Sequence, residues 1–257
     1  MPEVSVILAS LNERQNLPRL LDQIALLNLP SYEVLVVDDG STDGTQEYLG
    51  AVSRDDARVH PILNDARQTL TIAHLQGITA ARGTFVIVMD SDLQHPADSI
   101  PAMLSRLRGG ADLAIGSRHA PGGSVGGRPL LRGVMSRVAT LIAQIFLPES
   151  RRVSDPISGY FGFRRSVFRP FDRAYRGYET LLFLLVMCRG QRVTEVAYHF
   201  QERSDGESRI TQDLGFVRVF LTQVLFAIRF RSRIAAVVGI DGGPTPHSTK
   251  PLTPTDA

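Results

Sequence analysis

The chain has 257 residues, of which 43% are hydrophobic and 21% are charged, so it can bury the core of one large globular domain. Its 28 Lys and Arg residues nearly balance 26 Asp and Glu residues, and the net charge of +2 provides no overall field that would recruit nucleic acid. A single cysteine, Cys188, excludes an internal disulfide and fits a reducing compartment, so we expect a cytoplasmic location.

The beginning of the chain, MPEVSVILAS, has neither the basic region nor the apolar region of a secretory signal, so we expect none. No apolar run reaches the roughly 18 to 20 residues of a membrane span. The best candidate, residues 219–228, is bounded by Arg218 and Arg229. It is too short to cross a membrane, but it could lie on a surface.

The first 120 residues alternate between strand and helix patterns. Strand patterns occupy residues 3–10, 32–39, 57–64, 84–90 and 111–118, and helix patterns occupy residues 13–28, 41–52, 69–82 and 97–110. Continuous apolar strands separated by helices indicate a parallel sheet that is covered on both faces. The sequence therefore predicts an α/β fold with a Rossmann-like, mostly parallel sheet and helices on both faces.

The pattern changes after residue 120. We expect a Gly-rich loop (119–129), a helix (130–147), a strand (159–165), a buried helix (177–190), an edge strand (192–200), a polar loop (203–211) and an amphipathic helix (213–231). We divide the chain into one domain (1–212), a C-terminal amphipathic helical segment (213–238) and a disordered tail rich in Pro, Thr and Gly (239–257). The final helix could rest on an anionic membrane surface, pack on the sheet or form a homodimer contact, and the pattern does not choose among these.

Two of the predicted strands end in acidic residues. Asp38 and Asp39 precede Gly-Ser-Thr-Asp-Gly, which could be only a turn and a helix cap. A carboxylate at a strand end can also accept hydrogen bonds from a nucleobase or a ribose. Ligands of parallel sheets bind at the carboxyl ends of strands, so this position has to be considered as a site.

The second acidic strand end is Asp90-Ser91-Asp92-Leu93-Gln94. A helix cap accounts for one carboxylate, but two neighbouring carboxylates repel each other unless a cation neutralises them. Oxygen ligands without nearby cysteine suit Mg²⁺ or Mn²⁺ rather than zinc. Such an ion usually completes its coordination with substrate phosphates, and His95 next to Pro96 is better placed for a supporting role.

Four arginines stand in or beside Gly-rich or polar loops: Arg118, Arg132, Arg203 and Arg209. Most surface arginines are simply solvated, but arginine also binds phosphate with two parallel hydrogen bonds. Cys188 lies within an apolar helix, where packing explains it better than catalysis. The chain has no Gly-x-Gly-x-x-Gly after its first strand, no Gly-x-Ser-x-Gly elbow and no Walker loop.

Seven segments together carry a family resemblance. In chain order they are SVILASLNERQNL, EVLVVDDGSTDGT, ARGTFVIVMDSDLQHP, LAIGSRHAPGGSVGG, LRGVMSRVA, VSDPISGYFGFRRSVF and QERSDGESRI. Over residues 3–212 the chain resembles the GT-A, family-2 glycosyltransferases, and most of all the polyprenyl-phosphate (dolichol-phosphate) mannosyl- and glucosyltransferases. VVDDGSTDGT alone is typical of the broad family, whereas MDSDLQHP with GSR, SDPISG and Gly-Glu-Ser-Arg is more specific.

The resemblance implies a GT-A fold and a role for each matching residue. The residues that it places around the donor nucleotide are Leu11, Glu13, Asp39, Asp90, Ser91 and Arg209, with Asp39 reading the base and Glu13 near the ribose and base. It gives the metal ion, Mg²⁺ or Mn²⁺, the ligands Asp90, Asp92 and Gln94. Asp92 is also counted as catalytic, together with three arginines: Arg118 and Arg132, which would receive the acceptor phosphate, and Arg203, which would close over the diphosphate with Ser208 and Arg209.

Some positions depart from the family pattern. The family's Pro-Thr-Tyr-Asn-Glu is here Ala9-Ser10-Leu11-Asn12-Glu13, which lacks the aromatic side chain that would flank the base. The Gly-rich start of one helix is replaced by RQTLTIAHLQG, and Glu179 and Phe183 stand where the family tends to have Lys and Glu. These changes surround the expected donor and acceptor sites.

The function implied by the resemblance is metal-dependent, inverting transfer of a hexose from a nucleotide diphosphate sugar (GDP-mannose or a UDP-sugar) to a polyprenyl phosphate, with peripheral contact at the cytoplasmic face of the membrane. A phosphate acceptor needs no general base, because its second pKa is about 6. Two alternatives stay open. One is transfer to a soluble small molecule, for which Asp155 or Glu179 would be the base. The other is a non-catalytic subunit that binds nucleotide sugars.

Overall fold

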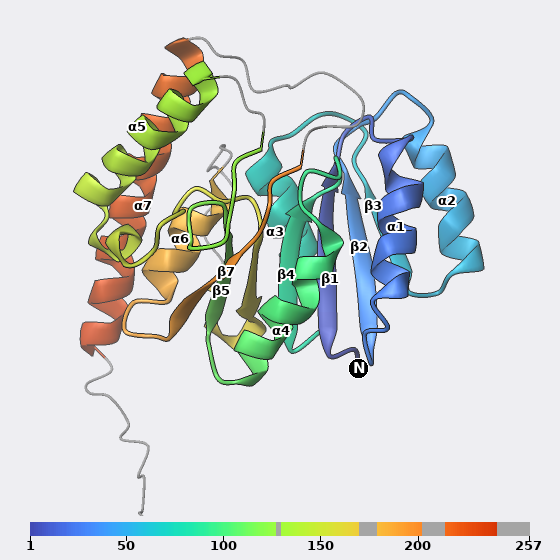
Figure 1. Ribbon diagram of the computed structural model, residues 1–257, viewed down its shortest axis with the longest axis horizontal. Helices are drawn as coiled ribbons and strands as arrows, with labels where there is room; N and C mark the ends of the chain where they lie inside the picture. Colours follow the sequence, from blue (N-terminus) through green and yellow to red (C-terminus); the bar gives the residue numbers. More distant parts are fainter. Residues whose placement is uncertain (127–129, 170–178, 202–213, 241–257) are drawn as a thin grey trace, which may run out of the picture.

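The computed structural model describes residues 1–126, 130–169, 179–201 and 214–240, without the side chains of 130–132, 214–217 and 233–240. Within these residues, seven strands form one sheet in the order β3-β2-β1-β4-β6-β5-β7 (Figure 1). The strands are β1 (Val4–Ser10), β2 (Tyr32–Asp38), β3 (Val59–Leu63), β4 (Phe85–Asp90), β5 (Leu113–Ser117), β6 (Phe161–Arg164) and β7 (Val193–Ala197). Strand β6 is antiparallel to β4 and β5, and the other neighbouring strands are parallel. The predicted mostly parallel α/β sheet is confirmed.

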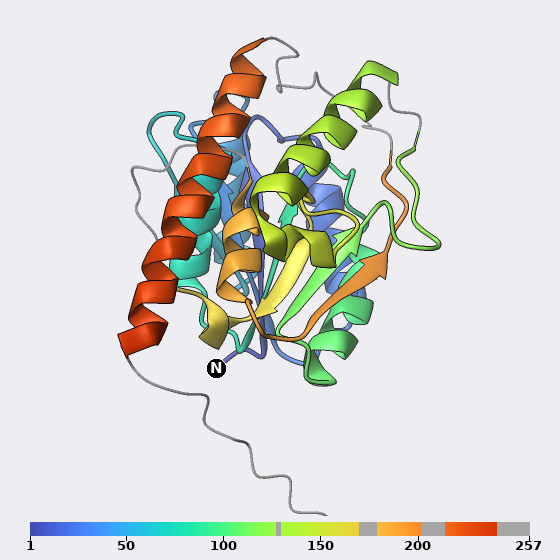
Figure 2. The same cartoon turned by 90° about the vertical axis from the view of Figure 1, so that its left-hand side faces the viewer.

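Helices cover both faces of the sheet. They are α1 (Asn16–Leu26), α2 (Thr45–Asp55), α3 (Leu70–Ala80), α4 (Ile100–Arg108), α5 (Leu130–Phe146), α6 (Thr180–Met187) and α7 (Leu214–Ile240), with short 3-10 helices η1 (Ala97–Ser99), η2 (Pro148–Arg152) and η3 (Arg165–Val167). Helices α1, α2 and α4 share one buried cluster with the sheet, and α3 and α6 share another on the opposite face. Helices α5 and α7 lie side by side outside α6 (Figures 1 and 2).

Strand β1 shows why the sequence pattern was continuous rather than alternating. All seven of its residues are buried. Val6 and Leu8 pack in the cluster of α1 and α4, whereas Ile7 and Ala9 pack in the cluster of α3. Because both faces of the central strands are covered, both sets of side chains are mostly apolar. Strand β7, in contrast, is at the sheet edge and its residues are only partly buried, as its alternation predicts.

Helix α6 is buried on all sides. Leu181 and Leu184 pack toward the sheet, whereas Leu182 and Phe183 pack toward α5 and α7. A helix that is apolar all round is stable only when it is enclosed in this way. Cys188 follows its last turn and is buried with the sheet-side cluster, which agrees with the packing role expected for it.

Helix α7 is longer than the predicted 213–231 and is packed into the fold. Its buried residues Phe220, Val224 and Ala227 contact the cluster that α5 and α6 complete. Among the described helices, none is both long and apolar enough to cross a membrane. Residues 241–257, most of the segment predicted to be a disordered tail, lie outside the described residues.

A buried carboxylate anchors α7. Arg231 Nε donates to Glu149 Oε1 at 2.8 Å, and the Glu149 side chain is 5% exposed. We expect Arg231→Met to lower the free energy of unfolding by about 1–3 kcal/mol, because a buried charged group loses its hydrogen-bond partner. Urea unfolding checks this. The control is Arg229→Met, which removes the same charge from an exposed position two residues earlier. Equal losses in the two variants would contradict an anchoring role for Glu149.

Candidate functional site

The strand ends with acidic residues meet at one edge of the sheet. In the parallel pairing of β1 with β2, Ser10 lies opposite Asp38, and in the pairing of β1 with β4, Ala9 lies opposite Asp90. The chain leaves β1 toward β2 on one side, and β4 lies on the other side. Sheets with this topology bind ligands outside the carboxyl ends of the strands where the order reverses. The predicted donor and metal residues are therefore brought to the position where a ligand is expected.

Residues 90–95, which we call the metal loop, form a compact turn after β4. Leu93 has a φ of 64°, a left-handed conformation that is uncommon outside glycine, while its side chain is buried in the core. Gln94 N donates to Asp92 Oδ1 at 3.1 Å, and Ser91 Oγ donates to the carbonyl of Ala9 at 2.7 Å. These bonds join the turn to β1 and hold the predicted ligands within one loop.

His95 supports this loop from the core side. The main-chain N–H of Asp90 donates to His95 Nδ1 at 3.1 Å, so this nitrogen is an acceptor. The imidazole stacks on Tyr160 with 5.2 Å between ring centroids and contacts Tyr198 and Phe200 edge to face. The supporting role expected for His95 matches this arrangement.

Asp38 and Asp39 differ in what they contact. Asp38 accepts hydrogen bonds from Ser41 N at 2.9 Å and from Gln46 Nε2 at 2.7 Å, so it stabilises the turn and the first part of α2. Asp39 Oδ1 accepts from Gln68 N at 2.8 Å, before α3. Burial raises the pKa of Asp39 above its usual value. The turn-and-cap interpretation thus accounts for Asp38. Asp39 instead joins the loop after β2 to the loop before α3.

The loop after β1 is joined to the loop after β2. Asn12, with a φ of 52°, accepts a hydrogen bond from Thr42 N at 2.8 Å and donates its own N–H to Ser41 Oγ at 2.7 Å. Glu13 is buried, and its carboxylate accepts from Asn16 Nδ2 at 2.6 Å. Leu11, one residue before Asn12, is partly buried. The loop that carries Leu11 and Glu13 is therefore held against the loop that follows β2.

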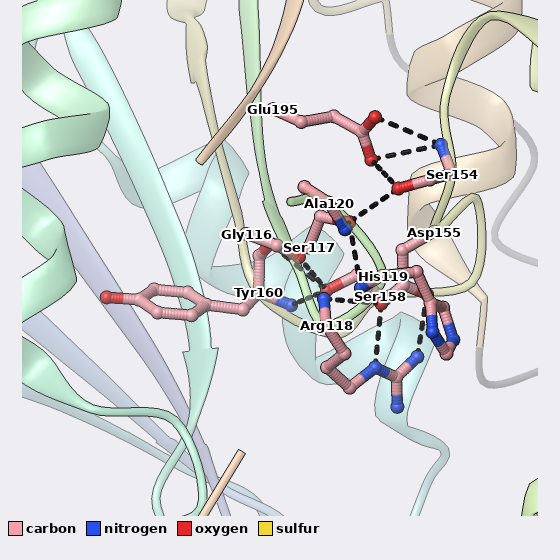
Figure 3. A network of polar contacts seen from close by, with 10 residues as sticks. All are labelled: Gly116, Ser117, Arg118, His119, Ala120, Ser154, Asp155, Ser158, Tyr160 and Glu195. Carbon is pink, nitrogen blue, oxygen red and sulfur yellow. Dashed lines mark hydrogen bonds and ion pairs between the residues drawn. The ribbon is translucent and has the colours of Figure 1, made fainter. Parts of the chain in front are cut away.

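Arg118 and Asp155 form a buried ion pair at the end of β5. Arg118 Nε and Nη2 each donate to an Asp155 oxygen at 2.7 Å, and the main-chain N–H of Arg118 donates at 3.1 Å. Burial opposes ionisation of Asp155, but the hydrogen bonds and charge of Arg118 outweigh it and hold the pKa of Asp155 below its usual value. Figure 3 shows the third guanidinium nitrogen directed away from this carboxylate, where it can meet a further anion.

A network of hydroxyl groups holds the segment around Asp155 (Figure 3). Ser154 Oγ lies 2.8 Å from Ser117 Oγ and donates to Glu195 of β7 at 2.7 Å. Ser158 Oγ donates to the carbonyl of Gly116 at 2.6 Å. The SDPISG segment is thus bonded to β5 and to β7, which fixes the carboxylate that pairs with Arg118.

Gly159 brings the same segment close to the metal loop. A Cβ added at this glycine would lie 3.3 Å from His95 Cε1 and 3.4 Å from Asp90 Oδ2. The first of these distances leaves almost no room for a side chain. The Asp90 carboxylate, the imidazole of His95 and the Arg118–Asp155 pair are therefore neighbouring parts of one site.

Glu179 lies just before α6 and close to these charges. Burial raises the pKa of Glu179 to about 8; Arg118 acts in the opposite direction, and Asp155 and Asp90 add to the rise. Its carboxyl group therefore holds a proton near neutral pH.

The oxygen groups of the metal loop fit a divalent ion. Asp90 is 34% exposed at its side chain, Asp92 is nearly buried, and Gln94 Nε2 donates to the carbonyl of Gln201 at 3.3 Å. Because Nε2 faces Gln201, the amide oxygen of Gln94 faces away from Gln201. Two carboxylates and an amide oxygen are ligands that Mg²⁺ and Mn²⁺ prefer. Within the described residues, no group of three His, Cys, Asp or Glu side chains has the geometry of a metal site, so the amide of Gln94 and substrate oxygens would have to complete it.

The arginine predictions fall partly outside the described residues. Arg118 is placed as above. Arg132 belongs to α5, but its side chain is not among those described, and Arg203, Ser208 and Arg209 lie outside the described residues altogether. Their proposed contacts with phosphate stay predictions.

Several residues of the site were not found by sequence reasoning. The aromatic residues beside His95, the pairing of Asp155 with Arg118 and the contact of Gln94 with Gln201 all join positions far apart in the chain. The only sequence signal was indirect. Tyr160 and Asp155 stand in the SDPISGY segment, and Tyr198 and Phe200 end the predicted edge strand.

The sequence matches the model of the family described as "Glycosyl transferase family 2" over residues 5–171. It is 37% identical over 210 residues to a dolichol-phosphate mannosyltransferase of Pyrococcus furiosus, covering 81% of this chain and 59% of that protein. It is 34% identical over 215 residues to a polyprenol monophosphomannose synthase of Mycolicibacterium smegmatis, covering 80% of each chain. The chain thus spans less than two thirds of the length of the Pyrococcus relative.

The fold also has solved counterparts. Glucosyl-3-phosphoglycerate synthase from Mycobacterium tuberculosis, in complex with Mn²⁺, UDP-glucose and phosphoglyceric acid, aligns with a TM-score of 0.65 and 22% identity over 90% of this chain and 79% of that chain. At this identity the match concerns the fold alone. It confirms the expected GT-A type of α/β fold.

The pKa of Glu179 leads to a test on stability. Its value of about 8 in the folded chain is above the ordinary 4.5, so the native state binds a proton that the unfolded state releases. The stability that protonation of Glu179 contributes to the folded state is therefore lost as pH rises from about 5 to 8. We expect the thermal midpoint of Glu179→Gln minus that of the wild type to be larger at pH 8.5 than at pH 5. Both proteins are measured with EDTA present. For the exposed control Glu47→Gln, we expect the same difference from the wild type at both pH values. The same result for Glu179→Gln would contradict the raised pKa of Glu179.

Proposed function

The chain belongs to glycosyl transferase family 2, and on that premise we propose that it transfers a hexose from a nucleotide diphosphate sugar to a polyprenyl phosphate. The observation that carries the proposal is the convergence of the metal loop, Asp39 and the Arg118–Asp155 pair at one sheet edge. The names of the two relatives support a polyprenyl-phosphate acceptor and mannose as the hexose. GDP-mannose is therefore the first donor to test, and UDP-sugars are the second.

We propose that the donor binds over the ends of β1, β2 and β4. Asp39 would accept an N–H of the base with the carboxylate oxygen that does not contact Gln68. Glu13 would lie near the ribose. Asp90, Asp92 and Gln94 would hold Mg²⁺ or Mn²⁺, which when bound neutralises the charge of the diphosphate leaving group. The Mn²⁺ in the Mycobacterium tuberculosis structure supports a divalent ion.

The acceptor phosphate would bind at Arg118. The Asp155 carboxylate holds the guanidinium in place through Nε and Nη2, so the third nitrogen is presented without the loss of side-chain entropy that a free arginine would suffer. Arg132 and Arg203 would add charge to the same phosphate and to the diphosphate. A phosphate oxygen then attacks the anomeric carbon, its new C–O bond forms as the bond to the nucleotide diphosphate breaks, and the configuration inverts.

The residues near the acceptor position favour a phosphate over an alcohol. An alcohol acceptor needs a general base. Asp155 is occupied on both oxygens by Arg118, and Glu179 already holds a proton near neutral pH. A phosphate brings its own negative charge and needs neither. This supports a phosphate nucleophile over the soluble acceptor that would need Asp155 or Glu179 as its base.

We further propose that the outer faces of α5 and α7 rest on an anionic membrane surface, where the lipid acceptor resides. Apolar side chains that are 41% to 61% exposed occur along both helices: Val134, Val138, Leu141, Ile145, Leu221 and Leu225. Neither helix contains Asp or Glu, whereas both contain arginines. An apolar face with cationic residues is the composition that binds anionic lipid surfaces.

The activity has a direct test. Purified protein is incubated with GDP-mannose or a UDP-sugar, Mg²⁺ or Mn²⁺, and a short polyprenyl phosphate. We expect a glycolipid product, and we expect Asp92→Ala to lower kcat/KM by about 10²–10³-fold, because developing charge on the leaving group loses its stabilisation. Product formation is followed by mass spectrometry and radiolabel transfer.

Asp98→Ala is the matched control, since it removes an exposed carboxylate six residues further on and should change kcat/KM less than about twofold. The absence of glycolipid with every donor would refute the proposed acceptor. Donor binding without transfer to any acceptor would favour the non-catalytic alternative. Full activity of Asp92→Ala would remove Asp92 from the metal site.

The membrane proposal is tested by sedimentation with vesicles of phosphatidylcholine alone or with phosphatidylglycerol. We expect binding only to the anionic vesicles, weakened by salt, and reduced more than tenfold by Leu141→Glu with Leu225→Glu. The control Leu26→Glu changes an exposed leucine on α1, which Figure 1 shows on the opposite side of the molecule. Equal effects of the two changes would count against a specific face. Loss of self-association instead of lipid binding would point to the predicted homodimer contact.

A further inference from the structure

Residues 198–201, which we call the connecting segment, continue from β7 along the edge of the site. On one side they pair with the Gly-rich loop, of which residues 119–126 are described. The N–H of Ser124 donates to Tyr198 O at 3.1 Å, and Phe200 N donates to Ser124 O at 2.9 Å. Ser124 Oγ also lies 3.0 Å from His199 Nδ1. The Gly-rich loop is thus held by main-chain bonds to this segment.

On its other side the connecting segment pairs with the metal loop. Gln201 N donates to the carbonyl of Gln94 at 3.1 Å. The side-chain Nε2 of Gln94 donates back to the carbonyl of Gln201 at 3.3 Å. Because the amide nitrogen faces Gln201, the amide oxygen faces away from it. Gln201 therefore sets which atom of Gln94 is presented to an ion.

Side chains of the connecting segment reach the same two regions. The buried ring of Phe200 lies 5.8 Å from the ring of His95 in the metal loop, and Arg118 Cζ lies 5.8 Å from the centroid of the same ring. The buried ring of Tyr198 contacts His95 as well. One aromatic side chain thus touches both the support of the metal loop and the arginine proposed to bind the acceptor phosphate.

We infer that the connecting segment couples the metal loop to the Gly-rich loop, with Gln201 as the positioning residue. An ion that takes the amide oxygen of Gln94 fixes Gln94, and the paired bonds then fix Gln201. Because the backbone between residues 198 and 201 cannot stretch, this restraint passes to Ser124. Ion binding and the order of the Gly-rich loop are therefore linked, and linkage acts equally in both directions. The inference rests on the metal site of the proposed function.

The experiment compares Gln201→Pro with Gln201→Ala in the full chain. Proline removes the N–H that donates to Gln94, whereas alanine keeps that donor and removes only an exposed side chain. Mn²⁺ affinity is measured by electron paramagnetic resonance with UDP and, separately, with GDP. Amide hydrogen exchange of residues 121–126 is measured with and without Mn²⁺.

We expect Gln201→Pro to weaken Mn²⁺ binding about tenfold, because loss of the N–H bond to the Gln94 carbonyl frees the segment whose own carbonyl orients the Gln94 amide. It should also abolish the Mn²⁺-dependent protection of residues 121–126. Gln201→Ala should stay within about twofold of the wild type in affinity and keep the protection. Equal Mn²⁺ affinities of the two variants, or equal protection of residues 121–126, would overturn the inference.

Two further outcomes separate this inference from the proposed function. A wild type that binds no Mn²⁺ with either nucleotide overturns the metal site and the coupling together. A wild type that binds Mn²⁺ without any change in the exchange of residues 121–126 overturns the coupling alone. If circular dichroism shows that Gln201→Pro does not fold, Gln94→Glu decides. It keeps an oxygen ligand for Mn²⁺ but removes the Nε2 donor to the carbonyl of Gln201, so it should reduce the Mn²⁺-dependent protection at least threefold while Mn²⁺ still binds; unchanged protection refutes the coupling.

Discussion

The buried ion pair of Arg118 with Asp155 determines how the rest of the site is arranged. Both charges lie in the interior, where removal of either partner leaves the other without compensation. The pair can persist only if the backbone segments on both sides stay in place. On one side, hydroxyl groups bond the SDPISG segment to β5 and β7. On the other, Gly159 and Tyr160 continue from that segment to His95 and the metal loop. A single electrostatic requirement thus relates the proposed acceptor side to the proposed donor side.

Most of the fold could be predicted because burial on both faces leaves a strong pattern. Strands such as β1 and β4 carry four or five apolar residues in a row, which is typical of a parallel sheet covered on both faces. The place of β6 could not be predicted in the same way. It inserts antiparallel between β4 and β5, and nothing in a short apolar stretch distinguishes this from a parallel addition at the edge. The end of α7 was placed too early, because the helix pattern was ended at residue 231 although the Gly-Gly-Pro stop signal comes only after Ile240.

The candidate site was predictable where residues of the right type follow a strand directly. Asp39, Asp90, Asp92 and Arg118 were proposed in this way, and each lies at or just after the end of a strand in the structure. Adjacent residues of one type could not be told apart by pattern, and only the contacts assign Asp38 to the turn and Asp39 to the space between loops. Contacts between distant segments left no trace in local sequence, since Arg118 and Asp155 are 37 positions apart and Gln94 and Gln201 are 107 apart.

The left-handed backbone of Leu93 places two opposing demands on one position. The turn itself would be easiest for glycine, which adopts a positive φ without steric cost. The core beneath it needs a large apolar side chain, because Leu93 is 7% exposed among residues of the α1 and α4 cluster. The β-branched residues valine and isoleucine satisfy the core but clash with the backbone of the turn. Glycine satisfies the turn but leaves a cavity in the core. Few amino acids meet both conditions, so residue 93 should tolerate few substitutions even though its side chain lies in the core.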